Sequence, residues 1–172
     1  LKWKPLNWFI HIYIWVMRGT PLLLQLIFIY YVLPSVGIRL DRLPAALIAF
    51  TLNYAAYFAE IFRGGIDTIP KGQYEAAKVL KFTPGATVRY IVLPQVTKIV
   101  LPSVFNEIMS LVKDTSLVYA LGISDLILAS RTAANRDARL VPMFLAGAIY
   151  LIVIGVVTLV AKRIEKKFSY YK

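Results

Sequence analysis

The strongest constraint on this chain is an uncharged, apolar run over residues 141–161. A helix needs ~20 consecutive apolar residues to cross the ~30 Å hydrocarbon core of a bilayer, and this run is long enough. Basic residues cluster directly after it: Lys162, Arg163, Lys166 and Lys167. Such clusters mark the cytoplasmic ends of membrane helices. The run therefore predicts a membrane-spanning helix whose C-terminal end faces the cytoplasm.

The composition of the whole chain agrees with a membrane protein. Hydrophobic residues make up 59% of the 172 residues and charged residues only 17%, whereas soluble domains average roughly 45–50% and 25%. A chain of this size has too little interior to hide so much apolar surface from water. The composition therefore disfavours a water-soluble monomer, and it disfavours a disordered chain as well.

Further apolar runs predict additional membrane segments. Residues 44–62 are interrupted only by Asn53 and Glu60, while residues 90–112 are less uniform because they contain charged residues and prolines. Residues 117–129 are too short to span, which indicates a half-span or a re-entrant segment.

The first part of the chain has two interpretations. Residues 6–17 and 22–33 are each too short to cross a bilayer alone. Residues 18–21 separate them, so the pair is either one long helix broken near Pro21 or two half-helices. We expect Arg18 to cap or pair at this break. In total, four to five membrane-embedded segments are expected.

The charge distribution predicts the orientation. The net charge is +11, from 20 Lys and Arg against 9 Asp and Glu, and the basic residues lie between and after apolar runs. This is the positive-inside pattern of membrane proteins, and no basic cluster alternates with aromatic residues as in a nucleic-acid groove. We therefore expect residues 64–89 and the C-terminal tail in the cytoplasm and no nucleic-acid partner. Arg131, Arg136 and Arg139 would then lie outside, a mild violation of the rule.

The cytoplasmic loop, residues 64–89, contains too many helix signals for a plain connector. Asp67 and Thr68 are suitable N-caps for a first short helix. Thr83 and Pro84 repeat the start signal, with threonine as N-cap and proline at the first helical position. We expect two short helices joined by a sharp corner near residues 81–83, forming a rigid element that can dock into a cleft of a soluble partner.

The same loop resembles the EAA motif of the membrane subunits of ABC importers. That motif is written EAA-x3-G-x9-I-x-LP, and the chain has Glu75-Ala76-Ala77, then Lys81, then Ile91-Val92-Leu93-Pro94 at the same spacing. Every element is in register except the glycine, which is Lys81 here. In the family this glycine lies at the corner between two coupling helices. The lysine must therefore accept a less favourable backbone or shift the bend.

Further segments are similar to polar amino-acid permeases of this superfamily, namely residues 18–26, 59–66, 69–73 and 113–117. The resemblance implies an all-α, polytopic transmembrane helix bundle with a cytoplasmic two-helix coupling loop over residues 67–92. It also implies a single permease domain over residues 1–172 in a prokaryotic inner or plasma membrane. Family members normally begin with one or two further helices, which we expect this chain to lack.

The resemblance implies the partners that drive transport. The chain has no G-x-x-x-x-G-K-[ST] phosphate loop, so we expect it to be no enzyme and to hold no cofactor. ATP and Mg would bind to two copies of a separate ATPase subunit. The other implied partners are a second permease chain in a homodimer, an extracytoplasmic amino-acid-binding protein, the amino-acid substrate and the lipid membrane. The residues implied in coupling are Gln73, Glu75, Ala76, Ala77, Leu80, Lys81, Phe82 and Gly85.

One stripe of polar residues at membrane depth is a candidate substrate site. Asn53, Tyr57 and Glu60 are spaced four and three apart, hence on one helix face that can bind an ammonium or guanidinium group. Alternatively, Glu60 pairs with Arg63 at i+3 as a structural ion pair.

A second candidate lies where an apolar run ends in a polar corner. Lys113 and Asp114 suit the two charged ends of a zwitterion, and Ser116 is the third candidate there. Alternatively, the pair lies at the outer membrane interface, where the amine of Lys113 snorkels to water.

The carboxylates of both candidate sites favour a basic or polar amino acid such as arginine, histidine or glutamine. The alternative function is a self-contained secondary transporter or channel, which leaves the docking loop unexplained and shows no inverted repeat. His11 is the only histidine and no cysteine is present, so we expect no metal site. Aromatic residues that suit interfacial belts are Trp3, Trp8, Tyr170 and Tyr171.

Overall fold

Residues 4–168 are described in the computed structural model, and every regular element within them is a helix. The α-helices are α1 (Lys4–Gly19), α2 (Leu22–Ile27), α3 (Arg42–Asp67), α4 (Lys71–Val79), α5 (Pro84–Thr87), α6 (Leu93–Asp114), α7 (Leu126–Asp137) and α8 (Val141–Phe168). Shorter π- and 3-10 turns extend them at η1 (Phe28–Val32), η2 (Leu33–Val36), η3 (Val88–Val92) and η4 (Thr115–Leu121). The predicted all-α class is confirmed. Trp3, Tyr170 and Tyr171 lie outside the described residues.

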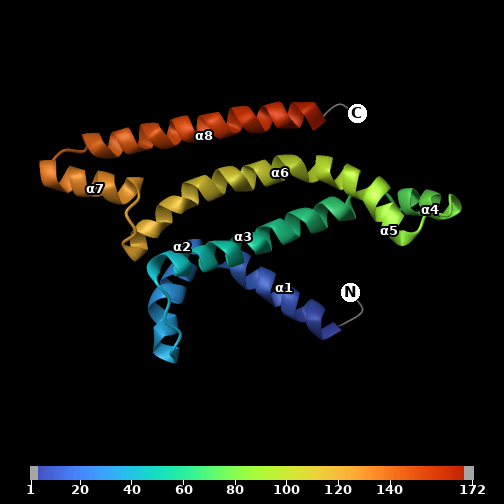
Figure 1. Cartoon of the computed structure of the whole chain (residues 1–172), viewed down its shortest axis with the longest axis horizontal. Helices are drawn as coiled ribbons and strands as arrows, with labels where there is room; N and C mark the ends of the chain where they lie inside the picture. The colour runs from blue at the N-terminus through green and yellow to red at the C-terminus, as the bar shows by residue number, and fades with distance from the viewer. Residues whose placement is uncertain (1–3, 169–172) are drawn as a thin grey trace.

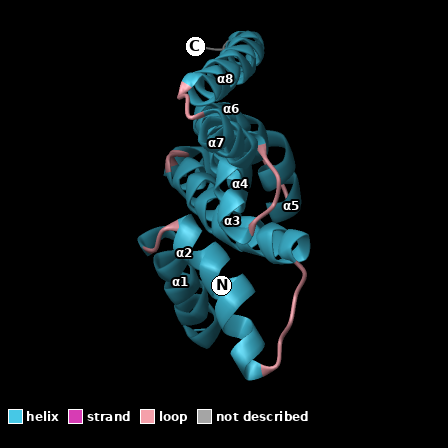
Figure 2. Ribbon diagram, turned by 90° about the vertical axis from the view of Figure 1, so that its left-hand side faces the viewer, coloured by secondary structure: helices cyan, strands magenta, loops and turns pink. Residues whose placement is uncertain are grey.

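The long helices pack in the order α1, α3, α6 and α8 (Figures 1 and 2). α2 leaves the end of α1 and packs on α3, while α7 packs on α8. Figure 1 shows α4 and α5 at one end of the molecule, where α8 also ends, and α7 at the opposite end. The chain is therefore a bundle of long helices with a separate two-helix element at one end.

Three helical stretches are long and apolar enough to cross a membrane: Arg42–Asp67, Pro84–Leu121 and Val141–Phe168. They include the three long runs that the sequence predicts. Lys4–Gly19 and Leu22–Val36 pass the same test only as a pair, and that pair is bent by 106° at its break. The break predicted near Pro21 is confirmed, and the bent pair is compatible with one broken span or with two half-helices. The described part of the chain thus has three spans, or four if the bent pair is one.

The outward surface of α8 is apolar, as a lipid environment favours. Only 6% of its most apolar window is buried inside the molecule, and large side chains such as Phe144 and Leu151 are exposed. In a bilayer such side chains contact lipid tails, so their exposure costs nothing there.

The interior next to the bend is built from small residues of α3. Ala45, Ala46 and Ala49 are buried against Leu22 and Leu26 of α2 in the same apolar cluster. Small side chains let helix backbones approach closely, which is the usual way that membrane helices pack. This packing keeps α2 on the side of α3.

The predicted half-span over residues 117–129 is two elements. The 3-10 turn η4 is capped by Gly122, whose φ of +69° is the left-handed region that favours glycine. α7 then begins at its N-cap Asp125, whose side chain accepts a 2.8 Å hydrogen bond from the Leu128 N–H.

The loop between α3 and α6 folds into two short helices, as the sequence predicts, but the start of the first differs. Pro70 occupies the N-cap of α4, and no side chain caps it. The predicted caps have other partners: Asp67 pairs with Arg63, and the Thr68 hydroxyl donates to the Gly65 carbonyl. The prediction of Asp67 and Thr68 as caps is therefore wrong, because α3 continues to Asp67 and includes the first of them.

The second start signal and the corner are confirmed. The Thr83 side chain accepts a 3.3 Å hydrogen bond from the Ala86 N–H, and Pro84 is the first residue of α5. Lys81 lies at the corner with φ +57°. The Phe82 N–H donates to the Ala77 carbonyl over 2.9 Å, and the Lys81 N–H donates to the Lys78 carbonyl over 3.0 Å. This is the Schellman pattern, which a glycine usually closes.

α3 and α6 approach closely near the two-helix element. Gly65 is buried, and a side chain built there would collide with Val100 and crowd Val96 of α6. Val96 and Val100 belong to an apolar cluster with Ile69 and Val92. Gly65 thus allows α3 to lie against the valine ridge of α6.

Candidate functional site

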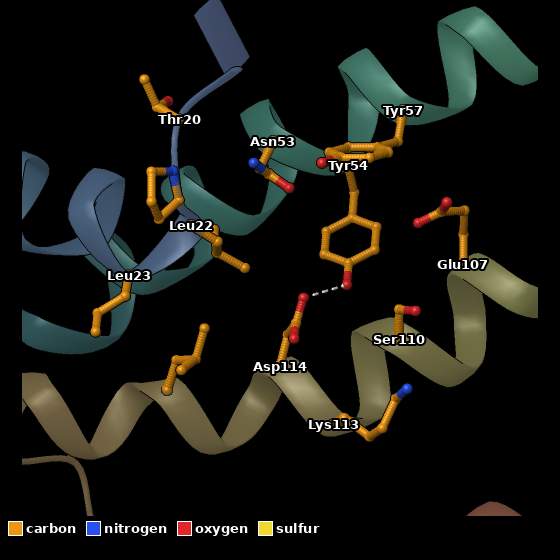
Figure 3. A pocket seen from close by; sticks show the side chains of 12 residues that line it. Thr20, Leu22, Leu23, Asn53, Tyr54, Tyr57, Glu107, Ser110, Lys113 and Asp114 are labelled. Carbon is orange, nitrogen blue, oxygen red and sulfur yellow. Dashed lines mark hydrogen bonds between the residues drawn. The ribbon is translucent and has the colours of Figure 1, made fainter. Parts of the chain in front are cut away.

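A cavity of about 420 Å³ lies between the α1–α2 break, the middle of α3 and the end of α6 (Figure 3). Its lining combines charged, hydroxyl and apolar side chains from three segments distant in sequence. The lining residues are Thr20, Pro21, Leu22, Leu23, Asn53, Tyr54, Tyr57, Glu107, Ser110, Lys113, Asp114 and Leu117. We call this the central cavity.

A hydrogen-bond network holds the helix break that forms one wall. The Asn53 amide of α3, 4% exposed, donates to the Met17 carbonyl over 3.1 Å and to the Gln25 side chain over 3.0 Å. The Gln25 amide in turn donates to the Thr20 hydroxyl over 2.8 Å and to the Met17 carbonyl over 2.9 Å. Pro21 has no N–H to offer, and its extended backbone separates the two helices. These amides therefore satisfy the carbonyl groups that the break leaves free.

The opposite wall presents the charges of α6. Asp114 accepts a 2.8 Å hydrogen bond from the Tyr54 hydroxyl, and Tyr54 is only 6% exposed. Figure 3 shows Asp114 and Glu107 pointing from α6 toward the tyrosines of α3. Lys113 supplies one positive charge to the same lining. The lining thus includes two carboxylates and one lysine, a set that suits a small molecule with charges of both signs.

The structure brings together four of the six predicted substrate residues: Asn53, Tyr57, Lys113 and Asp114 line the central cavity. Glu60 and Ser116 are not among its lining residues. The Ser116 hydroxyl donates to the Lys113 carbonyl over 2.7 Å.

Glu60 faces a neighbouring cavity of about 440 Å³, which is lined by His11, Ile14, Trp15, Arg18, Gly19, Glu60 and Arg63. The predicted i+3 pair is present, since Arg63 contacts both Glu60 oxygens over 2.9 and 2.7 Å. Arg63 also contacts Asp67 over 2.8 Å. Arg18 approaches Glu60 over 3.4 Å, so it pairs at the break as expected.

Four polar residues of the central cavity are not among the predicted substrate residues: Thr20, Tyr54, Glu107 and Ser110. Glu107 and Ser110 precede Asp114 by seven and four residues, which places them on the same face of α6. Helical spacing back from Asp114 would therefore have found them. Tyr54 precedes Tyr57 by three residues, so the same spacing along α3 would have found it as well.

The two-helix element presents an exposed surface at its corner. Val79 is 82% exposed and Leu80 69% exposed, and Phe82 is exposed beside them. Of the eight residues predicted for coupling, seven are exposed: Gln73, Glu75, Ala76, Leu80, Lys81, Phe82 and Gly85. Ala77 is only 1% exposed, so its methyl group packs inside the molecule and cannot face a partner.

No metal site is evident in residues 4–168, where no three His, Cys, Asp or Glu side chains gather in a suitable way. The central cavity has the features of a binding site for a polar molecule. Its arrangement between a helix break and two long helices is typical of substrate sites in transporters, where irregular backbone lines a cavity.

Comparison with known proteins places this geometry in context. Residues 2–170 match the family model described as "Binding-protein-dependent transport system inner membrane component". The L-cystine transport system permease protein TcyB of Bacillus subtilis is 38% identical over 172 residues, covering 99% of this chain and 74% of that protein. The arginine transport system permease protein ArtQ of the same organism is 38% identical over 168 residues, covering 96% and 77%.

Two further matches agree. The putative glutamine transport system permease protein GlnP of Rickettsia felis is 37% identical over 168 residues, covering 96% of this chain and 77% of that protein. A solved structure described as "Crystal structure of an amino acid ABC transporter with histidines" superposes with a TM-score of 0.89 at 33% identity. That match covers 97% of this chain and 78% of the other.

Proposed function

The chain belongs to the family of binding-protein-dependent transport system inner membrane components, and we propose that it moves polar or basic amino acids across the cell membrane. The cystine, arginine and glutamine permeases that it resembles support an amino-acid substrate. The observation that supports this proposal most directly is the central cavity, which holds charges of both signs between the helix break, α3 and α6.

The charges of the cavity match the two ends of an amino acid. Lys113 would pair with the substrate carboxylate, while Asp114, held by Tyr54, would accept its ammonium group. Glu107 lies about two helical turns from Asp114 and would contact the side chain of the substrate. An acidic side chain would face this carboxylate, so the arrangement favours arginine, histidine or glutamine over aspartate or glutamate.

The other predicted substrate residues have different roles. Asn53 acts mainly through the helix break, because its amide hydrogens are used by Met17 and Gln25. Tyr57 forms a wall of the cavity. Glu60 and Ser116 stay outside the substrate site, since the first pairs with arginines and the second bonds to backbone.

Coupling to ATP hydrolysis is assigned to the exposed corner of α4 and α5. Leu80 and Phe82 would enter a groove of a separate ATPase subunit, and Glu75 would lie at its rim. Two ATPase copies and a second, identical permease chain would complete the assembly with a substrate-binding protein outside. Closure of the ATPase pair would push this rigid element and rotate the helices that enclose the cavity.

The orientation follows from the basic residues at one end. α4, α5 and the C-terminal end of α8 lie at the same end of the molecule (Figure 1), and that end has Lys162, Arg163, Lys166 and Lys167. By the positive-inside rule this end is cytoplasmic and α7 lies outside. The permease would span a prokaryotic plasma membrane several times.

The test is ATP hydrolysis by the complete transporter in lipid vesicles, measured with a panel of amino acids. Asp114→Asn keeps an acceptor for Tyr54 but removes the charge, so we expect stimulation by the preferred amino acid to fall about tenfold or more. The matched control is Asp137→Asn, because Asp137 is a carboxylate on α7 far along the chain from the cavity and pairs with Arg136. Equal stimulation of the wild type and both variants would contradict the substrate site. The absence of stimulation by any amino acid would contradict the function.

A further inference from the structure

One charged residue beside the central cavity has no part in the proposal above. Arg18 lies in the last turn of α1, two residues before Thr20 of the cavity wall. Its guanidinium lies over the ring of Tyr57, 5.3 Å from the ring centroid. Tyr57 lines the central cavity, and Arg18 lines the neighbouring one. A positive charge therefore lies directly behind an aromatic wall of the proposed substrate site.

Arg18 belongs to a balanced cluster in which two arginines, Arg18 and Arg63, face the carboxylates of Glu60 and Asp67. Glu60 is shared with Arg63, which contacts both carboxylate oxygens, whereas Arg18 reaches one oxygen at the longer distance of 3.4 Å. The Arg18 side chain is 42% exposed. Because its guanidinium lies over Tyr57, the charge of Arg18 acts on the cavity through this aromatic wall.

The effect of Arg18 depends on the charges of the cavity lining. Glu107 and Asp114 contribute two negative charges and Lys113 one positive charge, so the lining alone has a net charge of −1. The neighbouring cluster of two arginines and two carboxylates is balanced, so removing the charge of Arg18 adds one further negative charge beside the lining. A net negative lining attracts an additional positive charge, while a balanced one matches a molecule whose own charges cancel.

We infer that Arg18 is a specificity-determining residue, whose charge behind Tyr57 disfavours amino acids with a cationic side chain relative to neutral polar ones. The inference rests on the proposed function, because it takes the central cavity as the amino-acid site. Arg18 acts from outside the lining, through the charge that it places behind Tyr57, and it does not contact the substrate. Removing its charge leaves Glu60 paired with Arg63, so the helix packing keeps its ion pair.

The experiment measures equilibrium binding of L-arginine and L-glutamine to the purified permease–ATPase complex without binding protein. The quantity compared is the ratio of the two dissociation constants. Arg18→Gln and Arg18→Met both remove the charge, with side chains of different shape. In both variants arginine should bind about tenfold more tightly relative to glutamine than in the wild type, the order expected for one partly screened charge several Å away. Arg18→Lys keeps a positive charge that can lie over the Tyr57 ring and should keep the wild-type ratio within about twofold.

Arg63→Gln is the matched control. It removes an arginine from the same Glu60 carboxylate, but Arg63 neither contacts Tyr57 nor lines the central cavity. We expect its ratio to change less than about twofold. Equal loss of both ligands in the Arg18 variants, an unchanged ratio, or failure of both uncharged variants to fold would assign Arg18 a structural role and overturn the inference. If the wild type binds neither amino acid, the proposed site itself is wrong. Wild-type binding with an unchanged ratio would refute only the role of Arg18.

Discussion

Lys81 occupies the left-handed backbone that the corner between α4 and α5 requires. The motif that the loop resembles has a glycine at this position, and the sequence left two outcomes open: a strained lysine or a shifted bend. The corner stays at residue 81, and the hydrogen bonds around it are those of a Schellman motif. The geometry of the element is therefore kept at the expense of local backbone strain, which for an L-residue is about 1 kcal/mol.

We expect Lys81→Gly to stabilise the chain by about 1 kcal/mol, because glycine adopts positive φ without a steric penalty. Thermal unfolding of the purified protein in detergent should show a midpoint about 2–4 °C higher. Lys78→Gly is the control, since Lys78 is exposed within α4 and a glycine there should lower the midpoint. A lower midpoint for Lys81→Gly would contradict the strain.

At the scale of elements, the contact between α3 and α6 depends on one glycine of a consecutive pair. Gly65 lies against Val100 and Val96, whereas nothing lies within 4 Å of a side chain built at Gly64. Both positions are helical, so propensity alone would make alanine favourable at each.

Gly65→Ala should therefore destabilise the protein by about 1–3 kcal/mol through overpacking, while Gly64→Ala should be neutral or slightly stabilising. The midpoint of thermal unfolding in detergent measures both. Equal midpoints for the two variants would show that α6 yields to the added methyl group and that the contact is not tight.

The two-helix element separates surface residues from packing residues. Glu75 is exposed on α4, so Glu75→Lys should leave thermal unfolding unchanged and weaken association with the ATPase subunit about tenfold or more. Ala77 is buried, so Ala77→Asp should lower stability by about 3 kcal/mol. Co-purification of the ATPase together with thermal unfolding distinguishes the two effects. Full ATPase recovery with Glu75→Lys would contradict docking at this face.

At the scale of the whole molecule, the orientation can be tested because the chain has no cysteine. Gly85→Cys on α5 and Asn135→Cys on α7 each introduce one exposed thiol at opposite ends (Figure 1). A membrane-impermeant maleimide should label Gly85→Cys only in inside-out vesicles and Asn135→Cys only in right-side-out vesicles. Labelling of both from one side would contradict the proposed topology.

The sequence by itself determined the long spans, the two short helices and the family. These depend on local patterns: apolar runs, the Thr83–Pro84 start signal, and a motif whose spacing lies within one loop. Within a single helix, spacing also determines which residues share a face. Asn53 and Tyr57 share the central cavity for this reason.

Only the tertiary structure decided which faces of different helices meet. The same spacing that joins Asn53 to Tyr57 also includes Glu60, yet the crossing of α1 over α3 places Arg18 against Glu60 and directs it to another cavity. Tyr54 and Glu107 enter the central cavity from two different helices. The relative rotation of helices depends on close packing at small residues, and helical periodicity contains no information about a neighbour.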